Sequence, residues 1–269
     1  MRFAWCLLWG VSTAAILRPA HAESAPSVPR GMRKVDPGEY RPLYPPSPQE
    51  TRVPVAAFYM DARPVTNSEF ARFVATAPEW GRGAPPRILA DESYLMHWEH
   101  PAAPGKKETP DAPVVHISWF AAKAYCAARG ARLPSEAEWE WAANASETKK
   151  DASGDKAFLE QIGSWYSTPH HGEVGRVARG KANIWGLFDM HGLIWEWVLD
   201  FNSTMTTTDA RDGGDKMRFC GAGALRASDT TDYVKFMRVA MRGSLRGDYT
   251  TSLLGFRCAR SVTPELEKP

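Results

Sequence analysis

Three helix-start signals, all between residues 66 and 138, constrain the fold more than any other feature of the sequence. Thr66-Asn-Ser-Glu69 and Ser135-Glu-Ala-Glu138 are capping boxes, in which a hydroxyl and a carboxylate satisfy the first free N–H groups of a helix. Ser118 can cap a third helix, which Gly130 would close. Beyond residue 145 the helical signal fades, and short aromatic and glycine-rich segments replace it. We therefore expect an α+β fold with a few helices, many short strands and much irregular structure.

The first 22 residues have the features of an export signal. Arg2 supplies positive charge, the run from Phe3 to Leu17 is mostly apolar, and Ala20-His-Ala22 offers a small-x-small cleavage site. The run is too short to span a bilayer, and a retained anchor helix is the alternative. We expect cleavage after Ala22 and a periplasmic mature chain.

The rest of the chain divides by composition. Residues 23–52 carry seven prolines and little apolar periodicity, which predicts an extended arm outside the domain. The first strand candidate is Val53–Tyr59, and polar residues 145–160 and 201–216 are expected to be surface insertions. The expected organisation is a signal peptide (1–22), a Pro-rich N-terminal arm (23–52), one folded domain (53–262) and a C-terminal tail (263–269).

The charge balance narrows the choice of partner. The signal contains two of the 33 Lys and Arg residues, so 31 basic and 31 acidic residues remain. Nucleic-acid-binding proteins usually carry a basic excess, so nucleic acid is not expected. No later segment is apolar enough for a membrane span. The expected partner is a protein, a peptide or a small molecule.

The cysteine count is odd after export. Of 4 cysteines, Cys6 leaves with the signal and three remain. In an oxidising compartment this predicts one disulfide with one leftover thiol, or a link to another chain.

Four segments, in order, resemble the sulfatase-modifying-factor family, whose founding member is the formylglycine-generating enzyme. The chain carries Val65-Thr-Asn67 ahead of two phenylalanines, Pro113–Trp119 followed by Arg132–Glu140, then Gly186–Trp197, and Gly255-Phe-Arg257. The resemblance covers residues 53 to 260 and implies the family's fold, an elaborated C-type-lectin-like domain. It also implies a disulfide between Cys126 and Cys258. Closing so long a loop stabilises by about 4–5 kcal/mol in the chain-entropy treatment.

The resemblance also implies one structural calcium site. Asp189 and Glu196 would supply carboxylates, and Gly192 and Ile194 would supply backbone carbonyls, which are ligands that suit a hard cation. The family's usual Asn after the glycine is Leu193 here. The alternative from the residues alone is that both carboxylates cap turns and pair with nearby arginines.

The copper chemistry of the founding enzymes lacks its ligands in this chain. Those enzymes bind copper(I) through two cysteines shortly after a glycine-rich turn, which corresponds here to Gly221-Ala-Gly223. No cysteine lies between Cys220 and Cys258, and one thiol cannot form a paired-thiolate site. We expect no copper and no sulfatase activation, and we expect Cys220 to be inert, buried or bonded to another chain.

The histidines suggest no catalytic centre. His116 and His191 lie inside the fold motifs and are expected to be packed, while His97 and His100 lie in a polar loop. His170 and His171 are adjacent, so their side chains would point opposite ways in an extended segment. No 2-His-1-carboxylate pattern is present.

Two classes of function remain. The first is an accessory or maturation protein that binds a partner without copper chemistry. The pattern from Phe219 to Arg238 resembles the family branch encoded beside copper nitrite reductases. The second is a divergent oxidase or modifying enzyme, similar to the family member of pyoverdine maturation. An intact cleft with ordered acidic and basic groups would favour the enzyme, and a large exposed apolar patch would favour the binding protein.

Overall fold

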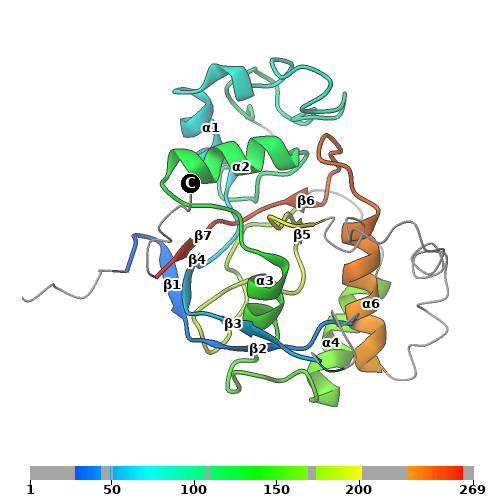
Figure 1. Ribbon diagram of the computed structural model, residues 1–269. Coiled ribbons are helices and arrows are strands. Elements are labelled where there is room, and N and C mark those ends of the chain that lie inside the picture. The colour runs from blue at the N-terminus through cyan, green and yellow to red at the C-terminus, as the bar shows by residue number, and fades with distance from the viewer. Residues whose placement is uncertain are drawn as a thin grey trace, which may run out of the picture.

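The computed structural model describes residues 28–43, 49, 51–106, 109–168, 174–201 and 230–262. A three-stranded antiparallel sheet lies at one side of the molecule (Figure 1). Its central strand is β4 (Phe58–Asp61), flanked by β1 (Met32–Val35) and β7 (Ala259–Ser261). Elements from the two ends of the chain therefore share one sheet.

Two smaller sheets complete the strands of the described part. β2 (Gly38–Tyr40) pairs antiparallel with β3 (Val53–Val55), and β5 (Trp195–Glu196) pairs parallel with β6 (Leu254–Gly255). The β5–β6 pair brings the motif around Glu196 beside the motif that contains Gly255.

The prediction that residues 23–52 form an arm outside the domain is wrong for β1 and β2. Met32 and Val35 are buried at the two ends of β1, while Arg33 and Lys34 between them are exposed. Tyr40 of β2 is also buried. The strands are only three or four residues long, so their few apolar positions gave no clear alternation among the prolines. The folded part begins before Val53.

The three predicted helix starts are confirmed. α1 (Asn67–Val74) and α3 (Glu136–Ala143) begin with complete capping boxes at Thr66 and Ser135. α2 (Trp119–Ala128) begins at Ser118, whose hydroxyl accepts the Ala121 N–H. A short 3-10 helix, η1 (Pro78–Trp80), follows α1.

The expectation that helices fade after residue 145 is wrong. α4 (Lys156–Ser167) begins at Asp155, and α6 (Thr230–Gly243) lies against it (Figure 1). The inward face of α6 includes buried charged side chains, Lys235, Arg238 and Arg242. Because sequence patterns identify a buried helix face by its apolar residues, a face built partly from charges gives little signal.

The main core joins the first three helices to the sheets. Its largest fully buried aromatic side chains are Trp98, Trp197, Phe58, Phe70 and Phe256. Trp197 Nε1 donates to the Ile117 carbonyl at 2.7 Å, so even the polar edge of this ring is satisfied. Within the described ranges, no helix combines the length and the apolar character that a bilayer crossing needs.

Candidate functional site

α6 (Thr230–Gly243) follows the turn at residues 221–223 in the sequence, and it carries a buried ionic cluster. Arg238 and Arg242 of α6 both reach Glu140 of α3. Arg238 donates from Nε and NH2 to the carboxylate, with the NH2 to Oε2 distance 2.7 Å, and Arg242 NH1 lies 2.7 Å from Oε1. The Glu140 side chain is only 2% exposed. We call these three residues the Glu140 cluster.

The Glu140 cluster stays charged despite its burial. Burial alone would raise the pKa of Glu140, but Arg238 and Arg242 lower it to about 2. Burial likewise favours the neutral form of Arg238, yet Glu140 raises the pKa of that guanidinium above its usual value. Both arginines also lie over the Trp139 ring, with the Arg242 guanidinium 5.0 Å from its centroid. The cluster fastens α6 onto α3.

A second buried pair holds the motif at residues 186–197. Arg257 donates to both carboxylate oxygens of Glu196, at 2.8 and 2.7 Å, and Trp139 Nε1 donates to Oε2 at 2.8 Å. The side chains of Arg257 and Glu196 are 0% and 1% exposed. Arg257 also donates to the Phe188 carbonyl at 2.9 Å, so it ties this motif to the end of β6.

The residues expected to bind calcium have other contacts in the structure. Arg257 and Trp139 supply three donors to Glu196, and a carboxylate has about four acceptor sites. Asp189 adopts a positive φ of 56° and its Oδ2 accepts the Ala178 N–H at 2.6 Å. The alternative pairing of a carboxylate with a nearby arginine is thus found for Glu196.

The remaining two expected ligands lie in the turn between those carboxylates. The Gly192 carbonyl accepts the Ile194 N–H at 2.8 Å, and Gly192 has a φ of 111°, which favours glycine. Among the described residues, no group of three or more His, Cys, Asp or Glu side chains is arranged to hold a metal ion. The calcium site, which also relies on backbone carbonyls, stays a prediction.

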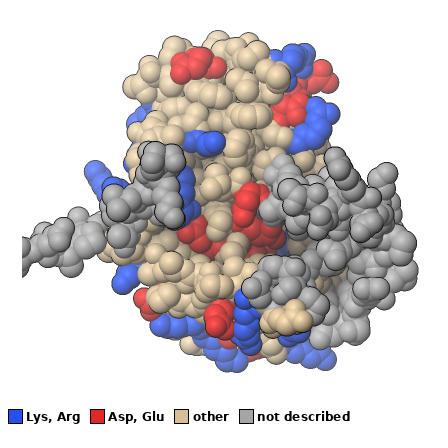
Figure 2. Space-filling model, in the orientation of Figure 1, with Lys and Arg blue, Asp and Glu red and all other residues tan. Residues whose placement is uncertain are grey.

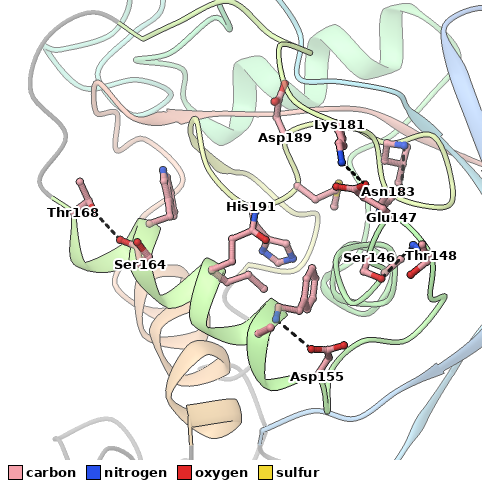
Figure 3. A pocket seen from close by; sticks show the side chains of 18 residues that line it. Ser146, Glu147, Thr148, Asp155, Ser164, Thr168, Lys181, Asn183, Asp189 and His191 are labelled. Atoms are coloured by element: carbon pink, nitrogen blue, oxygen red, sulfur yellow. Dashed lines mark hydrogen bonds and ion pairs between the residues drawn. The ribbon is translucent and has the colours of Figure 1, made fainter.

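A cavity of about 780 Å³ opens between α4 and the loops on either side of it (Figure 3). Its wall combines ordered charges with aromatic rings, since Lys181 Nζ lies 3.0 Å from Glu147 Oε2 and both Phe158 and Trp165 line it. Figure 3 shows His191 near the middle of this cavity and Asp189 at the end away from α4. Its size is in the range of small-molecule sites.

His191 lines this cavity and is fixed by a hydrogen bond to the backbone. Its Nε2 lies 2.6 Å from the Ala143 carbonyl, which can only accept, so Nε2 carries the proton. Burial lowers the pKa of His191 to about 4, so the ring is neutral at pH 7. Its Nδ1 is then an acceptor, and it has no protein partner among the described residues.

His97, which the sequence places in a polar loop, is packed against His116. Their ring centroids are 5.4 Å apart, and burial lowers the pKa of both rings, that of His97 to about 4. The described surroundings give no hydrogen-bond partner to either ring nitrogen of His97 or to Nδ1 of His116. His97 is therefore a packed histidine, although it lies in a loop.

The cysteines divide as the family resemblance implies. Cys126 of α2 and Cys258, one residue before β7, form a disulfide with their Cα atoms 5.6 Å apart. Cys258 N also donates to Asp61 Oδ2 at 3.0 Å, so the bridge joins α2 to the central sheet. Cys220, the turn at residues 221–223, and His170 and His171 lie outside the described residues.

Comparisons with known proteins agree with this architecture. Residues 18–262 match the sequence profile described as the sulfatase-modifying factor enzyme 1-like domain. The formylglycine-generating enzyme of Streptomyces coelicolor is 30% identical, over 93% of this chain and 95% of its own length. The inactive C-alpha-formylglycine-generating enzyme 2 of mouse is 31% identical, over 78% of this chain and 77% of its own length. The structure of PvdO from Pseudomonas aeruginosa superposes with a TM-score of 0.48 and 18% identity, over 86% of this chain and 94% of that one.

The described fold combines helices and short strands around an irregular core, and the profile match and the two sequence relatives define its family. The chain belongs to the sulfatase-modifying-factor family and has its fold, an elaborated C-type-lectin-like domain.

Sequence reasoning missed three features of the site. It noted that this part of the sequence lacks cysteines, but it did not find the helix or the roles of Arg238 and Arg242. The two buried arginines of α6, Arg238 and Arg242, are four residues apart, and residues four apart lie on the same face of a helix. That spacing, together with the acidic residues Glu136 and Glu140, could have indicated that a helix in this part of the sequence pairs with α3.

Proposed function

We propose that this protein is an exported accessory or maturation factor that uses the family fold for binding and has no copper-dependent formylglycine-generating activity. One observation carries the proposal. Of the four cysteines in the sequence, Cys126 and Cys258 are joined to each other, which leaves only Cys6 and Cys220. Copper(I) is held by paired soft thiolates, and these two cysteines are far apart in sequence, one of them in the expected signal peptide.

The Glu140 cluster supports the same proposal. α6, which follows the turn at residues 221–223 in the sequence, presents guanidinium groups whose donors are directed at Glu140. Arginine cannot bind a metal ion through a protonated guanidinium, and it stays protonated here because Glu140 raises its pKa. Arg238 and Arg242 of α6 therefore support a role in packing rather than in metal binding.

The test is a conversion assay on the complete mature chain. The protein is incubated with a peptide that carries a sulfatase-type cysteine motif, with copper and oxygen supplied, and aldehyde formation is followed by mass spectrometry. We expect conversion no faster than with free copper. The Cys220→Ser variant is the matched control and should give the same trace. Conversion above the free-copper rate that is lost in Cys220→Ser would overturn the proposal.

A modifying enzyme without copper is the second candidate, and the 780 Å³ cavity is the observation that favours it. The Lys181–Glu147 ion pair and His191 line the cavity, and a concave site with charged groups and a histidine is expected of an enzyme cleft. His191→Phe should then abolish turnover of a substrate identified by a metabolite screen while preserving the fold. Retained turnover would exclude His191 from the chemistry.

Export and the association with nitrite reduction are part of the proposal. The apolar run after Arg2 supports a cleaved signal, and the pattern from Phe219 to Arg238 supports the nitrite-reductase-associated branch. N-terminal sequencing of protein from the periplasmic fraction should begin at Glu23. A copper nitrite reductase gene beside this one would support the accessory role, whereas a siderophore cluster would favour the modifying enzyme.

A further inference from the structure

A groove of about 890 Å³ on the sheet side of the molecule is lined by an unusual number of arginines. Its lining residues come from β1, the end of β4, α1, the end of α2 and adjacent loops. β1 and β4 lie at one side of the fold (Figure 1). Its basic and acidic lining residues are Arg30, Arg33, Arg63, Arg72, Arg129, Asp61 and Glu69. We call this surface the arginine groove. It is separate from the 780 Å³ cavity, with which it shares no lining residue.

Two of the five arginines are paired within the groove. Arg129 makes a two-pronged contact with Asp61, at 2.8 and 3.0 Å, and Arg63 makes one with Glu69, at 2.9 and 3.0 Å. The Asp61 side chain is nearly buried, and its Oδ2 also accepts the Cys258 N–H. These contacts fix the guanidinium planes of Arg63 and Arg129.

The other three arginines have no carboxylate partner in the described part of the chain. Arg33 donates only to its neighbouring Met32 carbonyl, at 3.0 Å. Arg30 and Arg72 are exposed, and no contact with a protein acceptor is described for either. Five arginines and two carboxylates leave the groove with three uncompensated positive charges.

That imbalance is unfavourable without a ligand. Like charges around one hollow repel each other, and the repulsion is stronger where protein walls exclude water. The chain as a whole has a formal charge of only +2, and Figure 2 shows both basic and acidic side chains on the described surface of one face, so an excess of three charges in one groove is a local feature. An anion that entered the groove would relieve the repulsion.

We propose that the arginine groove binds a small molecule that carries two or more oxyanion groups, phosphate or carboxylate. The planar guanidinium matches both groups in a two-pronged contact, and arginine cannot lose its charge at physiological pH. The volume of the groove lies in the range of small-molecule sites. Arg33 on β1 and Arg72 on α1 would contact the ligand directly. Arg63 and Arg129, which are fixed by Glu69 and Asp61, form the wall of the groove behind it.

The test uses pyrophosphate and citrate as probes, with the full mature chain, in isothermal titration calorimetry at fixed ionic strength. We expect one of the probes to bind, and its identity shows which oxyanion the groove prefers. Because each lost charged hydrogen bond is large compared with thermal energy, Arg33→Gln and Arg72→Gln should each weaken binding about tenfold or more. Both side chains are exposed, so neither change should disturb folding.

Arg87→Gln is the matched control, because Arg87 is an exposed arginine outside the groove, paired with Glu92. It should leave the dissociation constant unchanged. Raising the salt concentration from about 50 to 200 mM should weaken binding, as expected for a charge-dominated site. No binding of either probe at millimolar concentration would overturn the proposal, as would equal losses in Arg87→Gln and the groove variants.

Discussion

The Glu140 cluster and the arginine groove are built from the same chemistry in opposite surroundings. In the cluster, Glu140 and its two arginines are 2–7% exposed and touch only protein. In the groove, the paired side chains of Arg63 and Arg129 are about one-third exposed, at 35% and 34%. In the cluster, Glu140 contacts both arginines and Glu136 adds a second carboxylate contact to Arg242, at 3.3 Å, whereas the groove has two carboxylates for five arginines.

The two regions differ in which acceptors their arginine N–H groups can reach. In the cluster, Trp139 and Tyr166 cover the arginines together with Glu140, so no ligand is needed to complete their surroundings. In the groove, the exposed donors face a hollow and can exchange water for a ligand. Buried pairs are costly to break, while exposed pairs contribute little to stability. The first region should therefore respond to mutation through stability and the second through binding.

The largest expected effect comes from breaking the Glu140 cluster. Glu140→Gln keeps the shape of the side chain but leaves the buried Arg238 without a carboxylate partner, and Arg242 keeps only Glu136, at 3.3 Å. We expect the free energy of unfolding to fall by about 3–5 kcal/mol, measured by urea denaturation. Glu147→Gln, in an exposed pair with Lys181, is the matched control and should change it by less than about 1 kcal/mol. A small loss in Glu140→Gln would show that α6 is not fastened by charge.

Acid should weaken the cluster side of the molecule in two steps. The pKa of His191 is about 4 in the folded state and about 6.5 when unfolded, so its contribution is complete above pH 6.5 and lost towards pH 4. The pKa of Glu140 is about 2, so its contribution is lost from about pH 4.5 to pH 2. Melting temperatures recorded from pH 7.5 to pH 4 should fall, and His191→Asn should flatten that slope. An unchanged slope in His191→Asn would rule out His191 as a source.

Calcium, if it binds as the family resemblance implies, stabilises the segment beside the cluster. At a concentration of about one hundred dissociation constants, a ligand of the folded state adds about 2.7 kcal/mol. Chelation should lower the melting temperature, and Asp189→Asn should remove most of the difference by removing a charged ligand. Glu147→Gln should keep it. Identical melting temperatures with calcium and with chelator would contradict the predicted calcium site.

The smallest expected effect comes from the groove. Glu69→Gln removes one charge of the Arg63–Glu69 pair but retains a capping-box side chain for α1. Because the pair is partly exposed, we expect a loss of about 0–1 kcal/mol in urea denaturation. The same change should tighten pyrophosphate binding, since it frees Arg63. A loss as large as that of Glu140→Gln would erase the contrast between the two regions.

Much of the first half of the fold could be predicted because its signals are local. Thr66, Ser118 and Ser135 start helices through contacts with residues three positions away, and such contacts can be recognised in a sequence. The strands β1 and β2 could not be found in this way. They are defined by partners up to about 29 positions away, such as Asp61 opposite Met32, and no short pattern encodes that pairing.

The candidate site could be predicted only in part for a related reason. The Cys126–Cys258 pairing and the absence of a thiolate pair followed from family motifs and counting. Glu196 was assigned to calcium because its position matches a ligand, while the structure pairs it with Arg257, 61 positions later. Arg30 and Arg33 are neighbours in the sequence, but Arg72 of α1 joins them only in the folded chain. A charge that gathers through tertiary packing has no signature in one segment.

The central place of β4 has a consequence for the time order of folding. Its two neighbours come from opposite ends of the described chain, and the Cys258–Asp61 contact spans 197 positions. Contacts this distant close slowly, because most of the chain must be ordered first. Until β7 arrives, one edge of β4 has unpaired backbone groups that can recruit a strand from another molecule. A growing or truncated chain that ends before Ala259 lacks β7 and is therefore expected to be prone to aggregation.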